Sequence, residues 1–112
     1  MQKDCKAYLH HIYDSIVLIE KYVKGMAING FARDRKTVDA VIRNFEIIGE
    51  ASSKTSKEFR EEYPELPWKD MIGMRNILIH NYLGVDVQKV WRTVKKDLPL
   101  LKKQLRSILS IK

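Results

Sequence analysis

Apolar residues recur along most of the chain at every third or fourth position, which is the period of an α-helix. Four stretches carry this pattern: residues 3–24, a stretch from Asp34 to between Ser52 and Ser56, residues 68–81, and residues 86–109. Sustained alternation of polar and apolar residues, which is typical of β-strands, is missing from the sequence. The pattern therefore predicts an all-α fold, a bundle of four main helices that forms a single domain over residues 1–112.

Glycine, proline and capping residues predict where these helices begin and end. Asn29-Gly30 indicates a loop, and Asp34 is a suitable N-cap for the second helix. The segment SKEFREEYPELP, residues 56–67, contains two prolines and is predicted to be an ordered connection rather than a regular element. Pro99 lies inside the last apolar stretch, so we expect the C-terminal helix to be kinked or split near Asp97.

Composition restricts the class of protein. The 112 residues include 21 Lys and Arg against 14 Asp and Glu, a formal net charge of +7, which favours phosphate-bearing or acidic partners. The single cysteine, Cys5, excludes an intramolecular disulfide, argues against a cysteine-built zinc site, and fits a reducing compartment. The first residues lack the apolar stretch of a signal peptide, and no window is apolar enough to span a bilayer. We therefore expect a small basic cytoplasmic domain with no membrane partner.

The third predicted helix contains three polar residues, Arg75, Asn76 and His80, among apolar ones. Burying a guanidinium and an imidazole without partners costs several kcal/mol, so an internal acid, a second subunit or a ligand must meet them. Asn76 and His80 are four residues apart and lie on one helix face, but Arg75 and His80 are about 140° apart around an ideal helix. Either the arginine side chain bends round, the helix ends there, or two copies of the chain complete one site.

A structural role for these residues is the alternative. Arg75 then pairs with an acid on the second helix, Glu46 or Glu50. These two glutamates are expected to be partners of Arg75 or Arg43, or to line the wall of the cleft. No metal site is predicted: the adjacent histidines near the N-terminus point about 100° apart, and further ligands are missing.

The string MRNILIHNYLGVD, residues 74–86, resembles the signature of the HEPN superfamily of small helical RNases, and most closely that of the HepT-like toxins. That signature is an arginine, four residues, a histidine, any residue and a tyrosine, matched here by Arg75, His80 and Tyr82. Three further segments resemble the same family, so the resemblance covers residues 3–109; they are FEIIGEAS (45–52), YPELPWKDMIGMRN (63–76) and VWRTVKKDLPLLKKQL (90–105).

The resemblance implies a HEPN-type bundle and a metal-independent endoribonuclease that needs no cofactor and acts as the toxin of a toxin–antitoxin pair. RNA supplies its own nucleophile, the 2′-hydroxyl. His80 would then be the catalytic acid–base, because an imidazole with a pKa near ~6.5 exchanges protons at neutral pH. Arg75 would bind the phosphate, and Asn76 would orient the imidazole or contact the phosphate. In HEPN proteins these residues lie in a cleft at a homodimer interface.

Tyr82 has a separate implied role. In HepT-like toxins the motif tyrosine is the residue to which an MntA-like nucleotidyltransferase antitoxin attaches AMP, and an adenylyl group there would repel and block RNA phosphates. The structural alternative is an aromatic side chain that packs at the end of a helix. The alternative function for the whole chain is a non-catalytic HEPN interaction module that dimerises and docks a nucleotidyltransferase.

The positive charge is concentrated at one end of the chain. Residues 86–112 hold eight basic and two acidic side chains, so +6 of the net +7 lies there. Two interpretations stay open: the solvated face of an amphipathic helix, or a surface that follows RNA phosphates beside the cleft. Trp68 and Trp91 are predicted to make core or dimer contacts rather than to stack on bases.

Overall fold

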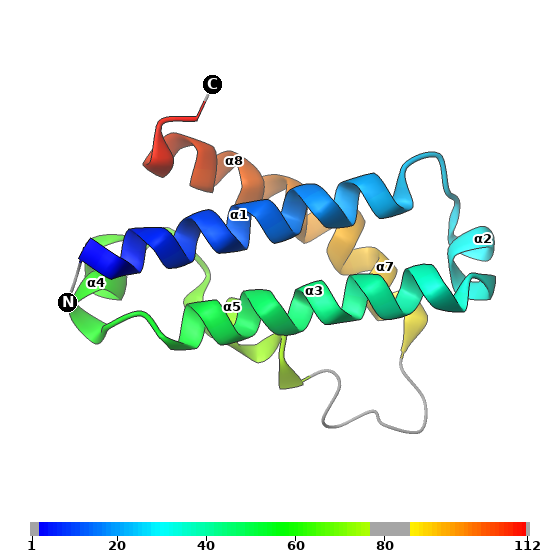
Figure 1. Ribbon diagram of the computed structural model, residues 1–112, viewed down its shortest axis with the longest axis horizontal. Helices are drawn as coiled ribbons and strands as arrows, with labels where there is room; N and C mark the ends of the chain where they lie inside the picture. The colour runs from blue at the N-terminus through cyan, green and yellow to red at the C-terminus, as the bar shows by residue number, and fades with distance from the viewer. Residues whose placement is uncertain (1–2, 77–85, 112) are drawn as a thin grey trace.

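The computed structural model of the protein describes residues 3–76 and 86–111, with side chains from Cys5 onward. All regular structure within these ranges is helical, so the predicted all-α fold is confirmed (Figure 1). The elements are α1 (Lys3–Val23), α2 (Ile28–Arg33), α3 (Arg35–Ser53), α4 (Lys57–Glu62), α5 (Trp68–Gly73), α7 (Val87–Arg92), a π-helical turn (Thr93–Asp97) and α8 (Leu98–Leu109). No helix in the described part of the chain is both long and apolar enough to cross a bilayer.

The two long helices α1 and α3 lie antiparallel and side by side, and α8 packs against α1 (Figure 1). Their facing stripes are the predicted ones and form the centre of the core. The apolar side chains that α1, α3 and α8 bury without any solvent exposure are Leu9, Ile12, Ile16, Ile19, Val41, Phe45, Ile48, Leu98 and Leu105. At the surface, Lys102 of α8 donates to Glu20 of α1 over 2.7 Å.

The C-terminal helix is divided where Pro99 predicts. Residues 93–97 form a π-helical turn between α7 and α8, and Pro99 lies in the first turn of α8. Proline has no N–H to donate and its ring clashes with the carbonyl four residues earlier. A wider π turn before Leu98 accommodates both effects, and α8 then begins afresh.

Three details of the predicted secondary structure are wrong. Asn29 and Gly30 lie inside helix α2, whose Phe31 is buried and stacks on Trp91 of α7 with ring centroids 5.0 Å apart. The segment taken for a connection contains helix α4, which starts at Ser56 because the serine hydroxyl accepts from the Phe59 N–H.

The third predicted helix, residues 68–81, is interrupted by a turn at residues 74–75, and the helical conformation resumes at Asn76. Helix α5 ends at Gly73, a weak helix former, and a turn at Met74 follows it. Residues 77–81 of that prediction lie outside the described residues.

The predicted N-cap of α3 is confirmed. A carboxylate oxygen of Asp34 accepts from the Thr37 N–H over 3.1 Å. This backbone hydrogen bond and one from the Thr37 side chain favour the ionised carboxylate, so the pKa of Asp34 is lowered from its ordinary value.

Candidate functional site

Arg75, the first residue of the predicted site, is held against the C-terminal half of α3. Its guanidinium Nη1 lies 3.6 Å from the Glu50 carboxylate and donates to the Ser53 hydroxyl over 3.2 Å. The Arg75 side chain stays 38% exposed and that of Glu50 54% exposed. Of the two acids that sequence analysis offered to Arg75, the structure selects Glu50, while Glu46 pairs with Arg43 at 2.7 Å.

Gly49 allows the Arg75 backbone to lie against α3. A Cβ atom on this buried glycine would be 2.6 Å from the Arg75 backbone nitrogen, 2.8 Å from the Arg75 Cβ, and 3.0 Å from the carbonyl oxygen of Ile72. Two of these three atoms belong to the backbone, so no side-chain rotation relieves the contact. A residue without a side chain is therefore required on the turn of α3 that faces Arg75.

Arg60 of α4 holds the C-terminal end of α3, which carries Ser53, through several hydrogen bonds. The Arg60 guanidinium donates to the carbonyl oxygens of Ser52, Ser53 and Thr55 and to the Thr55 hydroxyl, over 2.9–3.3 Å. Carbonyls at the end of a helix lack the usual donor four residues later, and Arg60 supplies one here, in addition to the Thr55 N–H and hydroxyl that donate to the Ser52 carbonyl. The Ser53 hydroxyl itself donates to the Glu50 carbonyl, which leaves its oxygen oriented to accept from Arg75.

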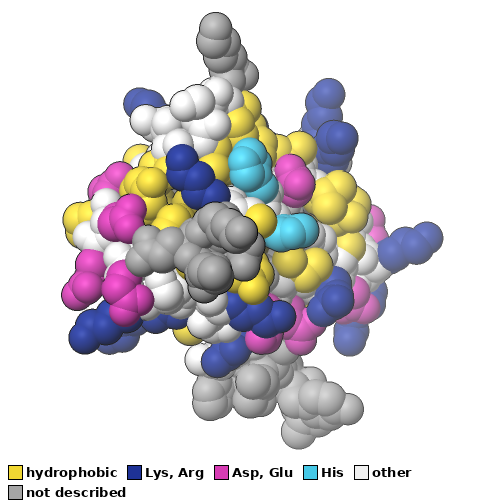
Figure 2. All heavy atoms as spheres, turned by 60° about the vertical axis from the view of Figure 1, so that its left-hand side comes forward, with side chains coloured by type: hydrophobic (Ala, Val, Ile, Leu, Met, Phe, Trp, Pro, Cys, Tyr) yellow, Lys and Arg dark blue, Asp and Glu magenta, His cyan; other side chains and the backbone are white. Residues whose placement is uncertain are grey.

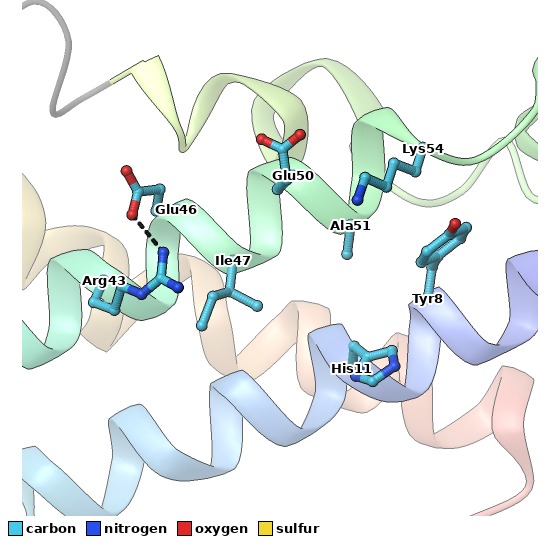
Figure 3. A pocket seen from close by; sticks show the side chains of 8 residues that line it. All are labelled: Tyr8, His11, Arg43, Glu46, Ile47, Glu50, Ala51 and Lys54. Carbon is cyan, nitrogen blue, oxygen red and sulfur yellow. Dashed lines mark hydrogen bonds and ion pairs between the residues drawn. The ribbon is translucent and has the colours of Figure 1, made fainter.

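A hollow of about 510 Å³ lies between α1 and α3, and Glu50, the partner of Arg75, is one of the residues that line it (Figure 3). Tyr8 and His11 of α1 line one wall, and the opposite wall belongs to α3, with Ile47 and Ala51 along its floor. The Arg43–Glu46 pair lies at one end and Lys54 at the other (Figure 3). The hollow is therefore polar at its ends and apolar along its middle.

The remaining predicted site residues are only partly described. Asn76 is exposed and directly follows Arg75. His80 and Tyr82 lie outside the described residues, so the catalytic roles of Arg75 and His80, the supporting role of Asn76 and the modification of Tyr82 stay predictions.

Ser53 is a site residue that was not predicted from the sequence; it is uncharged, and its hydroxyl accepts a hydrogen bond from Arg75. Ser53 follows Glu50 by three residues, so both lie on one face of α3, and this spacing was the available signal. The spacing could not predict which acid contacts Arg75, because Glu46 and Glu50 are one turn apart and lie on the same face of the helix.

The histidines and the cysteine near the N-terminus do not form a metal site in the described part of the chain. His10 and His11 are exposed, and Figure 2 shows histidine side chains at the surface beside hydrophobic ones. The Cys5 side chain is buried in the core. Among the residues that the structure describes, no three His, Cys, Asp or Glu side chains lie close enough together to hold a metal ion.

The tryptophans and part of the basic C-terminal segment contribute to packing. Trp68 and Trp91 are partly buried against the core, as predicted, and the Trp68 indole N–H donates to the Tyr63 carbonyl over 3.0 Å. Lys95 lies over the Trp91 ring at 5.2 Å from its centroid, and Lys102 pairs with an acid of α1. Lys89, Arg92, Lys96 and Lys103 are exposed on the same segment.

Comparison with known proteins places the chain in a family. The model of the ribonuclease HepT-like family matches residues 12–108, nearly the whole chain. The chain belongs to this family. The resemblance that the Arg75 motif and its companion segments carried is thereby confirmed. No solved structure gives a significant match.

Individual HepT-like relatives are similar over nearly all of the chain. A Methanocaldococcus jannaschii protein named as a gamma-glutamylcyclotransferase and candidate RNase is 49% identical over 109 residues, which is 97% of this chain but 49% of that protein. The chain thus spans about half the length of that relative. A Thermococcus cleftensis protein named "Probable ribonuclease HepT" is 47% identical over 102 residues, 91% of this chain and 93% of that one. A second M. jannaschii protein, named as a candidate RNase, is 42% identical over 107 residues, 96% and 98% of the two chains.

Proposed function

We propose that this HepT-like chain is a metal-independent endoribonuclease, the toxin of a toxin–antitoxin pair, with its active site in a cleft shared by two copies of the chain. The family match over residues 12–108 supports the RNase activity. The observation that carries the proposal for this chain is the placement of Arg75, whose guanidinium is oriented by α3 and whose side chain is still 38% exposed.

Arg75 is suited to bind the scissile phosphate. Its distance of 3.6 Å to the Glu50 carboxylate is longer than the ~2.7–2.9 Å of a strong charge-assisted hydrogen bond. A phosphate group that approaches the exposed guanidinium can therefore form shorter bonds than Glu50 does. Ser53 and Glu50 would keep the side chain extended in the meantime, which reduces the entropy lost on binding.

In the proposed reaction the 2′-hydroxyl of RNA attacks the adjacent phosphorus and loses its proton, and the bond from phosphorus to the 5′-oxygen breaks. The products are a 2′,3′-cyclic phosphate and a free 5′-hydroxyl, which gains a proton. His80 would carry out proton transfer at neutral pH, and Arg75 would stabilise the additional negative charge of the transition state. Asn76 would orient the imidazole or contact the phosphate. No step requires a metal ion.

The test compares purified wild-type protein with His80→Ala and Arg75→Ala on cellular RNA in the presence of a chelator. We expect both variants to keep the helical circular dichroism spectrum and to lose cleavage and growth toxicity, and we expect wild-type products to end in a 2′,3′-cyclic phosphate. His10→Ala is the matched control, because it removes an exposed histidine of α1 and should cleave normally. Undiminished cleavage by His80→Ala would exclude the mechanism.

We further propose that a nucleotidyltransferase antitoxin silences the toxin by attaching AMP to Tyr82. A bulky anion two residues from His80 would compete with RNA phosphates for the site. Mass spectrometry of protein co-expressed with an MntA-like nucleotidyltransferase should find AMP on Tyr82, and Tyr82→Phe should prevent the modification. Full inhibition of Tyr82→Phe by the antitoxin would show that inhibition works by masking instead.

One observation favours a second function, a non-catalytic module that dimerises and docks a nucleotidyltransferase. Arg75 already has an acidic partner in Glu50 and a hydroxyl partner in Ser53, as a purely structural arginine would. Under that function the purified protein cleaves no cellular RNA yet binds the nucleotidyltransferase tightly, and Arg75→Ala loses stability.

A further inference from the structure

Four basic side chains follow one exposed face of the C-terminal segment, which consists of α7, the π-helical turn and α8. They are Lys89, Arg92, Lys96 and Lys103, and all four are exposed. Successive members are three, four and seven residues apart, so each lies one or two helical turns after the one before it. We call this set the basic stripe. At ~1.5 Å per residue it extends over about 20 Å.

The structure separates the basic stripe from the other described basic residues of this segment. Lys95 lies over a tryptophan ring, Lys102 pairs with an acid of α1, and Arg106 is half-buried. Within the part of the chain that the structure describes, no member of the basic stripe takes part in an ion pair. The basic stripe therefore presents its charges to solvent, where an anionic partner can reach them.

A second hollow, of about 380 Å³, connects the basic stripe with the turn that carries Arg75. It lies between α5 on one side and α7 with the π-helical turn on the other, and Gly73, Met74 and Lys89 are among the residues that line it. Met74 directly precedes Arg75 in the sequence. The basic stripe thus begins beside the predicted phosphate-binding arginine and continues from there along the π-helical turn and α8.

Acidic side chains reduce the charge at this end of the basic stripe. The charged residues that line the second hollow are Lys69, Lys89, Asp70 and Asp97. Two lysines and two aspartates balance each other, so the hollow itself has no excess of either sign. The attraction for an anion comes mainly from the three members of the basic stripe that lie outside the hollow.

We propose that the basic stripe binds the backbone phosphates of the RNA strand on one side of the cleaved bond. The proposal rests on the RNase activity of the proposed function and identifies the surface that holds the substrate beyond Arg75. Phosphates follow one another at ~3.4 Å along a stacked strand, so about six of them fit along the basic stripe. Each of its four side chains can then contact a different phosphate, and such contacts hold a strand without reading its sequence.

An RNA strand fits the basic stripe better than an acidic protein or an anionic membrane does. The charges lie in a single file, as the phosphates of one strand do, whereas a membrane presents a wide sheet of charge. Leu100, which is 62% exposed, lies on the same face one turn after Lys96 and would offer a base an apolar surface between two phosphate contacts. The hollow beside Met74 places this surface next to the segment that carries the predicted active site.

The experiment measures the binding of a 2′-O-methyl RNA strand by fluorescence anisotropy at several salt concentrations. Such a strand keeps its phosphates but lacks the 2′-hydroxyl nucleophile, so it is bound and not cleaved. The double variant Arg92→Gln with Lys96→Gln should raise the dissociation constant about tenfold or more at about 0.1 M salt. Each lost phosphate contact removes about 0.7 from the slope of log K against log salt, so the slope should become shallower by about 1.4.

Two matched variants serve as controls. Lys6→Gln with Lys57→Gln removes the same two charges from exposed positions of α1 and α4, which lie at the end of the molecule away from α7 (Figure 1), and should leave the slope unchanged. Arg92→Lys with Lys96→Arg keeps both charges of the basic stripe and should bind as the wild type does. In cleavage assays the Arg92→Gln, Lys96→Gln protein should show a raised KM and an unchanged kcat, because neither side chain contacts the reacting phosphate.

An unchanged salt slope in the Arg92→Gln, Lys96→Gln protein would overturn the proposal. So would an equal loss of binding in the Lys6→Gln, Lys57→Gln protein, because RNA would then respond to net charge and not to the basic stripe. Loss of binding to phosphatidylserine vesicles with RNA binding intact would assign the surface to a membrane instead. Failure of the proposed function is distinct from these outcomes, because the 2′-O-methyl strand reports binding whether or not the protein cleaves ordinary RNA.

Discussion

Gly49→Ala tests how strictly α3 controls the position of Arg75. The added methyl carbon would lie 2.6 Å from the Arg75 backbone nitrogen and 3.0 Å from the Ile72 carbonyl oxygen, well inside van der Waals contact. Overpacking of this kind costs about 1–3 kcal/mol, and contact with backbone puts it near the upper end. The alanine recovers about 1 kcal/mol because it is the better helix former. We therefore expect a net loss of about 1–2 kcal/mol in the free energy of unfolding, measured by urea titration, together with reduced RNA cleavage as Arg75 moves away from Glu50.

Gly30→Ala is the matched control for this prediction. Gly30 lies in helix α2, has no positive φ, and has no atom within 4 Å of the position its Cβ would take. The same substitution there should stabilise the protein by about 0.5–1 kcal/mol and leave RNA cleavage unchanged. If the Gly49→Ala and Gly30→Ala proteins had the same free energy of unfolding and the same rate of RNA cleavage, the close approach of α3 to Arg75 would contribute nothing to stability or activity.

Two further predictions concern the ends of α3. Arg60→Ala should lower the free energy of unfolding by about 1–3 kcal/mol, because the Ser53 and Thr55 carbonyls lose the guanidinium donor and the Ser52 carbonyl loses one of its donors; a urea midpoint equal to that of wild type would contradict this. At the other end, the pKa of Asp34 is lowered in the folded state, so its ionised form stabilises the protein above the unfolded pKa of about 3.9, and that contribution is lost as the pH falls through the folded pKa. The stability difference between wild type and Asp34→Asn should accordingly be larger at pH 6 than at pH 3 in urea titrations, and a difference independent of pH would refute the assignment.

The long helices were predictable because their signal is local. The apolar stripes of α1, α3 and the C-terminal segment recur with helical period, and the interruption before Pro99 follows from the chemistry of proline itself. The short helices were not predictable in this way. Helix α2 forms although it contains Gly30, since Phe31 stacks on Trp91 from a distant part of the sequence. In α4, Phe59 is likewise held by Tyr63 and Trp68.

The same distinction applies to the site. The sequence indicated Arg75 as a polar residue that needed a partner and restricted the partner to two acids. The choice between Glu46 and Glu50 depends on how closely the Arg75 segment approaches α3, and Gly49 determines that approach. Such a contact joins residues 26 positions apart, so no periodicity in either segment reveals it. The hydrogen bond from Arg75 to the Ser53 hydroxyl also depends on this approach of two distant segments, so the sequence pattern did not predict it.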